Sequence, residues 1–453
     1  MFVELPPRRL WSDPWATESF ASRITALRRG KTRVAYYYDL PDSSTFRYRV
    51  YNMIQVLRCR DDGISASWFC RADSSHFDWI ADCCDVLVIC RARYTDRLSS
   101  MIERAKNSGR TVIFDVDDLV VDTRYAHLLM DALDQDTGSE AQLDHWFGYI
   151  GRLSTVLQLC DRAITTNEYL ASHIRASTGK DVRIVPNFIN REQLEYSLQL
   201  HAAKRTSRFA GDGRIHLGYF SGSPSHDNDF ELISDALARL LDKDPRLHVR
   251  LIGYLNVKGA VVRHRERIER AGMHDFLNLQ HLIASTEINL VPLQDNTFTN
   301  CKSELKFFEA GIVGTITIAS PVFAYRQAVS DGANGFLAGP CEWESKMLCA
   351  VETLSCLQGA YAEMAECAFE ISRSRYSWDS QFRVIASALL GAPNGPPEKR
   401  ALSTAIRFPE GPLSGPILCA PVRHLVDGAP CPQDAAARMS RANSISPGRP
   451  LDG

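Results

Sequence analysis

Short apolar runs alternate with segments of helical periodicity along most of this chain. In the first half, the predicted strands lie at 33–40, 64–69, 85–90, 111–118 and 160–167. Most are continuous apolar runs, which are typical of strands in parallel sheets whose two faces are both covered. Amphipathic segments separate them, so the succession of strand, helix and strand predicts a doubly wound parallel sheet.

The same succession begins again after a polar linker at about 196–213, with predicted strands at 214–222, 247–253, 288–293 and 315–320. We therefore predict an α/β protein with two Rossmann-like domains, residues 31–195 and 212–377, that face a cleft. A helix at 378–391 is expected to cross back to the first domain. Eleven of the 21 prolines follow position 391, so 392–453 is predicted to be a disordered tail.

Composition narrows the class of protein. At 453 residues, with 45% hydrophobic and 23% charged residues, the chain is typical of a soluble protein with more than one core. The net charge of −2 provides no overall field that would attract nucleic acid. The basic stretch 263–270 is typical of a solvated helix face. We expect no nucleic-acid partner.

The thirteen cysteines are scattered and several lie in apolar runs, which is typical of free thiols in a reducing compartment. The sequence begins without a signal-peptide pattern, and no apolar run reaches about 18 residues. We therefore expect a cytoplasmic protein, with at most peripheral contact with the inner face of a membrane.

The stretch that follows Thr299 concentrates the candidate chemistry. Asn300 is a good N-cap, which predicts a helix that opens at Cys301 or Lys302. Lys302 and Lys306 would then lie in its first turns, where the helix dipole disfavours cations. Free N–H groups of 302–304 and two lysines suit an anion such as a phosphate. The alternative is an amphipathic helix whose lysines are solvated.

The same stretch resembles a known family. A basic helix start, Glu-Ala-Gly at 309–311, a buried strand, Ala-Ser-Pro and Asp-Gly-Ala-Asn-Gly resemble the donor site of the group 1 glycosyl transferases. Those are retaining nucleotide-sugar enzymes of the GT-B fold. A subgroup pattern, Lys-Ser-x-x-Lys-x-x-Glu, matches Lys302, Ser303, Lys306 and Glu309.

The resemblance implies particular roles for these residues. Lys302, Lys306 and Glu309 would act in catalysis, with Glu309 also on the nucleotide ribose. Asn300, Cys301 and Ser303 would belong to the donor site. The family usually has a glutamate in contact with the donor sugar, eight positions before Glu309, and here that position is Cys301.

Residues after predicted strands complete the candidate set, because ligands bind at the carboxyl ends of strands in open α/β sheets. Gly222 and His226 follow the strand at 214–222 and would face the donor, although His226 would also serve as a turn residue that caps the next helix. Arg47 and Arg49 would hold donor phosphates or an anionic acceptor, or would lie on the surface as solvated side chains.

Asp115, Asp117 and Asp118 lie at the end of the strand predicted at 111–118. Such a group can hold a divalent cation, but it lies in the first domain, whereas the donor pattern lies in the second. We therefore expect Asp117 and Asp118 on the acceptor side, and no metal.

The resemblance implies a retaining glycosyltransferase that moves a sugar from a nucleotide-sugar donor to a glycan or glycolipid acceptor, without a cofactor or metal ion. Two alternatives remain open. One is a nucleotide-sugar epimerase, which needs further carboxylates and histidines in the cleft. The other is a non-catalytic protein that binds a nucleotide or a sugar, which the cysteine at 301 permits.

Overall fold

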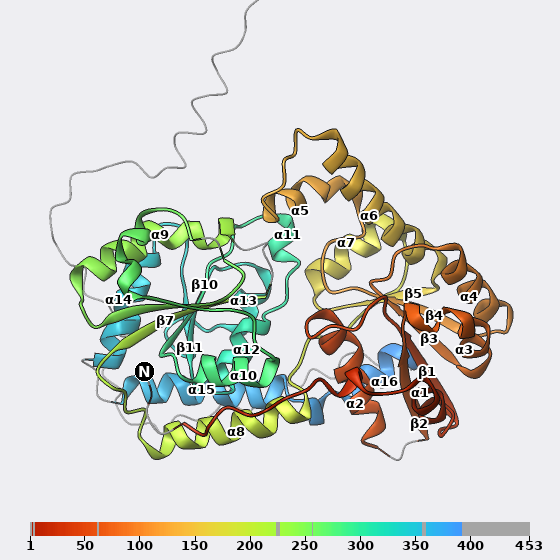
Figure 1. Ribbon diagram of the computed structural model, residues 1–453, viewed down its shortest axis with the longest axis horizontal. Coiled ribbons are helices and arrows are strands. Elements are labelled where there is room, and N and C mark those ends of the chain that lie inside the picture. The colour runs from red at the N-terminus through yellow and green to blue at the C-terminus, as the bar shows by residue number, and fades with distance from the viewer. Residues whose placement is uncertain are drawn as a thin grey trace, which may run out of the picture. The chain divides into compact units, whose positions relative to one another are not determined.

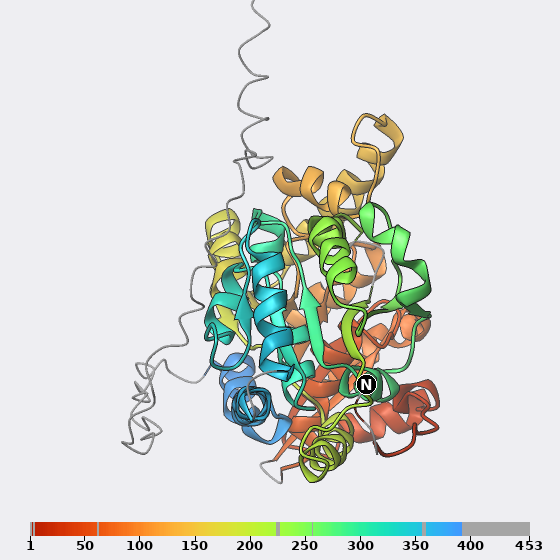
Figure 2. The ribbon, with the colours of Figure 1, turned by 90° about the vertical axis from the view of Figure 1, so that its left-hand side faces the viewer.

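The computed structural model describes residues 2, 5–60, 63–222, 227–255, 257–355 and 359–391. All of them belong to one unit of the chain, Met1–Pro396. The tail predicted at 392–453 lies outside the described residues. Two six-stranded sheets with helices on their faces make up this unit (Figures 1 and 2). No helix in the described ranges is both long and apolar enough to cross a membrane.

The first sheet has the order β2-β1-β3-β4-β5-β6, and every neighbouring pair is parallel. Its central strand β3 is wholly buried, as a continuous Val-Leu-Val-Ile-Cys run predicts for a strand covered on both faces. The strands are β1 (Thr32–Tyr37), β2 (Ile64–Phe69), β3 (Val86–Cys90), β4 (Thr111–Asp115), β5 (Arg162–Thr165) and β6 (Val182–Ile184).

Helices connect these strands, and half of them begin at a side-chain cap, which is Ser19, Thr95, Asn167 or Asn190. The helices are α1 (Phe20–Leu27), α2 (Asn52–Arg58), α3 (Phe77–Cys83), α4 (Asp96–Asn107), α5 (Ala126–Ala132), α6 (Glu140–Leu159), α7 (Glu168–Thr178) and α8 (Arg191–Thr206). Short 3₁₀ turns are η1 (Pro14–Ala16), η3 (Arg71–His76) and η4 (Thr123–Tyr125), and a π-helical turn, η2 (Arg47–Tyr51), leads into α2.

The second sheet has the order β12-β11-β10-β7-β8-β9 and is also parallel throughout. Its strands are β7 (Ile215–Ser221), β8 (Leu247–Gly253), β9 (Ile268–Ala271), β10 (Ile288–Val291), β11 (Ile316–Ala319) and β12 (Phe336–Leu337). The remaining helices are α9 (Asp227–Lys243), α10 (Phe276–Ala284), α11 (Thr297–Asn300), α12 (Leu305–Gly311), α13 (Phe323–Ala328), α14 (Trp343–Ser355), α15 (Ala360–Arg375) and α16 (Phe382–Leu390), with 3₁₀ turns η5 (Ala260–Arg267) and η6 (Trp378–Ser380).

The two sheets confirm the predicted fold class. In each, the strand order reverses at one place: beside β1 and β3 in the first sheet, and beside β7 and β10 in the second. Such reversals leave a crevice outside the carboxyl ends of the adjacent strands, where ligands bind. The strand orders therefore place a ligand site after β1 and β3 and another after β7 and β10.

Two local predictions were wrong. The polar stretch 196–213 begins inside α8, which packs on α10 and buries Lys204. Lys204 donates to the carbonyl of Gly314 and to Thr315, so its charge has internal partners and does not mark a solvated linker. The basic stretch 263–270 is a 3₁₀ turn followed by the edge strand β9, not a helix face. The domain boundaries 31–195 and 212–377 remain predictions.

Helix α12 carries Lys306 and Glu309 and packs on α15, while α16 packs against α2 and β6 of the first sheet. The contact between α12 and α15 is close at Gly311. A Cβ atom added there would lie 2.8 Å from the carbonyl oxygen of Ala368 and would collide with the hydroxyl of Ser372. Only glycine lets the two helices approach this closely.

We predict that Gly311→Ala lowers the thermal midpoint, although alanine is the better helix former by about 1 kcal/mol. Overpacking against Ala368 should cost about 1–3 kcal/mol and outweigh that gain. The matched control is Gly148→Ala in α6, where an added Cβ meets nothing within 4 Å. That change should raise the midpoint, measured by circular dichroism. A stabilised Gly311→Ala protein would contradict the described packing.

Candidate functional site

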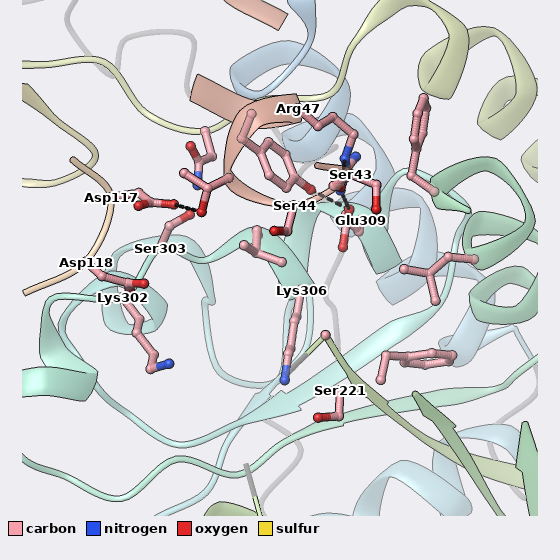
Figure 3. A pocket seen from close by; sticks show the side chains of 18 of the residues that line it. Ser43, Ser44, Arg47, Asp117, Asp118, Ser221, Lys302, Ser303, Lys306 and Glu309 are labelled. Atoms are coloured by element: carbon pink, nitrogen blue, oxygen red, sulfur yellow. Dashed lines mark hydrogen bonds and ion pairs between the residues drawn. The ribbon is translucent and has the colours of Figure 1, made fainter. Parts of the chain in front are cut away.

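A cavity of about 660 Å³ lies where the carboxyl ends of the two sheets come together. Its walls come from the segments after β1, β3 and β4, from α5 and α6, and from the ends of β7 and β10 together with α10 and α12. Figure 3 shows this pocket. Among the predicted site residues, those that line it are Arg47, Asp117, Asp118, Gly222, Lys302, Ser303, Lys306 and Glu309.

The donor segment does not form the single helix that the sequence predicted. Asn296, not Asn300, is the N-cap, because its side chain accepts from the N–H of Thr299 while the Thr299 hydroxyl takes the N–H of Asn296. The short α11 ends at Asn300, a turn follows, and α12 begins only at Leu305. The lysines therefore lie on a turn and on the start of a second helix.

This arrangement changes the role of two predicted donor residues, neither of which lines the cavity. The amide of Asn300 donates to Asp295, and its oxygen accepts from the N–H of Phe323 at the start of α13. Cys301 is fully buried in an apolar cluster, and its carbonyl accepts from Asn167. Burial raises the pKa of the Cys301 thiol. Both residues hold the segment in place.

Lys306 is the chemically most unusual residue of the pocket. Its Nζ is buried and has no hydrogen-bond partner among the described residues, and it lies 5.0 Å from the centre of the Tyr219 ring. Figure 3 shows it directed toward Ser221, at the end of β7. Burial lowers the pKa of Lys306 to about 8, against a smaller opposing effect of Asp229. A desolvated ammonium without a partner is suited to an anionic ligand.

Lys302 and Ser303 lie on the turn before α12. The Lys302 ammonium is 4.9 Å from the Phe298 ring and makes no hydrogen bond or ion pair within the described ranges. The Ser303 hydroxyl is buried and has no hydrogen-bond partner there either. The N–H of Lys302, expected to be free for an anion, donates to the carbonyl of Thr299. The N–H of Lys302 is therefore not free for an anion.

Glu309 joins the second sheet's α12 to the first sheet's η2. One carboxylate oxygen, Oε1, accepts from Arg47 Nη2 at 3.2 Å, from Gln193 Nε2 at 3.2 Å and from the hydroxyl of Tyr48. The side chains of Arg47 and Glu309 are both about 5% exposed, and the dashed lines of Figure 3 mark their contacts. All three donors converge on Oε1, so Oε2 remains the acceptor for a ligand in the cavity.

The two predicted arginines differ in position. Both are buried rather than solvated, which excludes the surface alternative. Arg47 lines the cavity, whereas Arg49 does not. Arg49 forms two hydrogen bonds with Asp115, at 2.8 and 3.0 Å, and a third with the carbonyl of Val185. Arg49 and Asp115 thus form a buried ion pair outside the cavity lining, and the predicted ligand role of Arg49 has no support.

Asp117 and Asp118 lie after β4 and share one guanidinium. Arg91 Nη1 is 3.0 Å from Asp117 and 2.9 Å from Asp118, and the hydroxyl of Thr45 donates to Asp117. Burial raises the pKa of Asp117, although the charge of Arg91 opposes that effect. Arg91 has a φ of 43°, a left-handed conformation that is costly for a side chain of this size. The strained backbone aims Arg91 at the two carboxylates.

Several lining residues were missed by the sequence reasoning. Arg91 and Arg93 directly follow the predicted strand at 85–90, so the carboxyl-end rule would have found them. Trp146 and Tyr149 of α6 form an aromatic wall with ring centres 5.6 Å apart. Their spacing of three residues looks like ordinary helix packing, and only the fold places them at a cavity. The other missed polar lining residues include Ser43, Ser44, Thr45, Asn187, Ser221 and His274.

The phosphate-facing loop that was predicted after β7 is described only in part. Gly222 lines the cavity and is exposed. His226 lies outside the described residues.

Comparisons with solved structures identify the fold. HepE of Anabaena, solved in complex with UDP, superimposes with a TM-score of 0.53 at 13% identity, covering 79% of this chain and 100% of that one. WaaG, a glycosyltransferase involved in lipopolysaccharide biosynthesis, gives a TM-score of 0.51 at 12% identity, with 79% and 100% covered. No family model and no curated protein matches the sequence.

At this identity the similarity establishes the architecture. The chain has the two-domain GT-B fold of these glycosyltransferases, and the predicted resemblance is confirmed at that level.

We predict that Glu309→Gln strongly destabilises the protein, because it leaves the buried guanidinium of Arg47 without its counter-charge. Loss of one partner of a buried ion pair costs about 3–5 kcal/mol. The double variant Arg47→Met/Glu309→Gln removes both charges and should recover most of that loss. Urea denaturation of the two variants checks this. Equal destabilisation of both proteins would show that the charge pair is not the cause.

Proposed function

We propose that this protein is a glycosyltransferase that transfers a sugar from a nucleotide-sugar donor, with the donor diphosphate held by Lys302 and Lys306. The observation that carries the proposal is the buried Lys306 ammonium without a hydrogen-bond partner, in a cavity at the carboxyl ends of β7 and β10. Neighbours with the same fold support the donor class, since HepE was solved with UDP and with UDP-glucose.

The two lysines have complementary tasks. Lys302, which is partly exposed, attracts the diphosphate. The Nζ of Lys306 is buried, and its attraction to the phosphate charge is stronger because water is excluded there. Negative charge grows on the leaving phosphate as the bond from the sugar carbon to its oxygen breaks. A fixed ammonium that is already desolvated stabilises this charge without reorganisation. We propose that this charge stabilisation takes the place of a metal ion.

Glu309 is assigned to the ribose and Ser303 to the donor sugar. The free Oε2 of Glu309 can accept from ribose hydroxyls while Oε1 stays bound to Arg47, Tyr48 and Gln193. The buried hydroxyl of Ser303 lines the cavity, whereas the thiol of Cys301 does not. Ser303 can therefore contact the donor sugar. It lies in the segment in which the resembled family usually has a sugar-binding glutamate.

We further propose that transfer retains the anomeric configuration and that the acceptor is a glycan or a glycolipid. The carboxylates in the lining of the described cavity are Asp117, Asp118 and Glu309, and each is paired with an arginine. None is a free nucleophile. The acceptor oxygen would attack on the face that the phosphate leaves, and the leaving phosphate oxygen would take its proton. Asp117 and Asp118 would orient the acceptor.

The alternatives are less well supported. An epimerase would need carboxylates and histidines free to move protons. His145 and His274 line the described cavity, but its lining carboxylates are tied to Arg47 and Arg91. A non-catalytic binding protein would share the donor site and lack turnover. Assay of the product therefore separates a transferase from a binding protein.

The direct test is release of nucleoside diphosphate from a panel of UDP, GDP and ADP sugars, with glycans and glycolipids present as acceptors of the sugar. We expect the wild-type chain to release nucleotide from one base class, and Lys306→Met to lose at least tenfold in kcat, since its charge acts in the transition state. EDTA should leave the rate unchanged. Loss of turnover in EDTA with rescue by Mg²⁺ would refute the metal-independent mechanism, and absence of turnover with intact binding would favour the non-catalytic alternative.

A second prediction concerns pH. Because the pKa of Lys306 is about 8 and a bound phosphate raises it, binding takes up a proton above that pH. Affinity for UDP should therefore fall about tenfold between pH 7 and 9. In Lys306→Met the affinity should be lower at pH 7 and lack this fall, whereas Lys302→Met should weaken binding and keep it. The measurement is calorimetry of UDP binding at several pH values. The difference in affinity between wild type and Lys306→Met cancels the contribution from ionisation of the ligand itself. Parallel pH profiles in wild type and Lys306→Met would refute the assignment.

A further inference from the structure

A second polar cluster lies at the amino ends of the second sheet, away from the cavity at its carboxyl ends. His216, His248 and Glu269 are each the second residue of their strands, β7, β8 and β9. His216 and His248 are register partners in the parallel pair of β7 and β8. Glu269 of β9 is the register partner of Arg250, which lies two residues after His248 in β8, so Glu269 is close to both histidines. One ligand atom from each of the three side chains lies within 4.8 Å of the others.

In this cluster, a ring nitrogen of His216 and a carboxylate oxygen of Glu269 face each other. Nε2 of His216 is 3.4 Å from Oε1 of Glu269. Arg250 donates twice to the other oxygen, Oε2, at 2.6 and 3.0 Å, which leaves Oε1 available. The second ring nitrogen of His216, Nδ1, is 3.4 Å from Glu287 Oε2, and it is buried without a hydrogen-bond partner among the described residues.

We propose that His216, His248 and Glu269 bind a divalent cation of the zinc class. Zinc takes imidazole nitrogens and carboxylate oxygens at about 2.0–2.2 Å, so tetrahedral ligand atoms lie about 3.3–3.4 Å apart. The separation of His216 and Glu269 already meets this value. His248 is only half-buried, and rotation of its side chain would close the remaining distance. The fourth position would be taken by solvent.

The surroundings of the three ligands suit a metal. Metal-binding histidines usually direct their other nitrogen at a carboxylate, and metal-binding carboxylates are usually hydrogen-bonded in turn. Here Glu287 is the carboxylate that lies beside the other nitrogen of His216, and Arg250 is the group that donates to the carboxylate of Glu269. The guanidinium groups of Arg250, Arg214 and Arg267 also lie near the two carboxylates, so a cation would be held by the three ligand atoms and not by an excess of surrounding negative charge. A bound ion would link β7 and β8 to the edge strand β9.

The test uses the full chain after treatment with a chelator. Zn²⁺ is titrated against a chromophoric competitor, with Mg²⁺ as the comparison ion, because oxygen-seeking Mg²⁺ should not bind histidines. We expect one equivalent of Zn²⁺ and a higher thermal midpoint in its presence. His248→Ala and Glu269→Gln, at half-buried and partly exposed positions, should each weaken binding at least tenfold. His127→Ala, at an exposed position of α5, should not change it.

Because the chain also has cysteines, Co²⁺ serves as a spectroscopic probe of the ligands. A nitrogen and oxygen site shows ligand-field bands without thiolate charge-transfer bands. Unaltered Zn²⁺ affinity in both His248→Ala and Glu269→Gln would overturn the proposal, as would thiolate bands or the absence of any bound ion. In the last case His216 would be a structural residue between two carboxylates. Glu269→Gln keeps the test valid if His248→Ala does not fold.

Discussion

The buried contact between Glu309 and Arg47 is the interaction on which the geometry of this molecule most depends. Two charges that are about 95% removed from solvent must remain together, since either one alone would be strongly unfavourable. One charge belongs to α12 of the second sheet and the other to the π-helical turn that follows β1 of the first. Tyr48 and Gln193 donate to the same carboxylate oxygen. The contact therefore fixes how the carboxyl ends of the two sheets meet.

The cavity follows from this constraint. Once α12 is held against η2 on one side and against α15 through Gly311 on the other, Lys306 is directed into the space between the sheets. Its desolvation is a cost that the folded chain carries in the absence of a ligand. An anionic donor would relieve that cost. In this account, the burial that lowers the pKa of Lys306 is also the reason that a diphosphate would bind there, since its negative charge would stabilise the buried ammonium.

Much of the fold could be predicted from the sequence, because its strands are short apolar runs in a regular succession with helices. The strands predicted at 85–90, 64–69 and 247–253 correspond to β3, β2 and β8 of the structure. The failures have local physical causes. Asn300 looked like a helix cap, but Asn296 and Thr299 form a reciprocal cap four residues earlier. The strand β9 was missed because Ile268–Ala271 is an edge strand with charged residues.

The residues of the candidate site could be predicted only where they belong to one short sequence motif. Lys302, Ser303, Lys306 and Glu309 are close in sequence and all line the cavity. The partners of Glu309 are 116 to 262 residues away in the chain, so no local pattern could indicate them. Arg49 and Arg47 looked equivalent, yet the turn η2 directs one to Asp115 and the other to the cavity. Their difference exists only in the folded chain.

The most direct measurement is a crystal structure of the full chain with bound UDP. The account predicts the diphosphate beside the ammonium groups of Lys306 and Lys302, and the ribose hydroxyls at Oε2 of Glu309, with the Arg47 contact retained on Oε1. UDP bound elsewhere, or UDP in the cavity with its phosphates directed away from both lysines, would contradict the central claim.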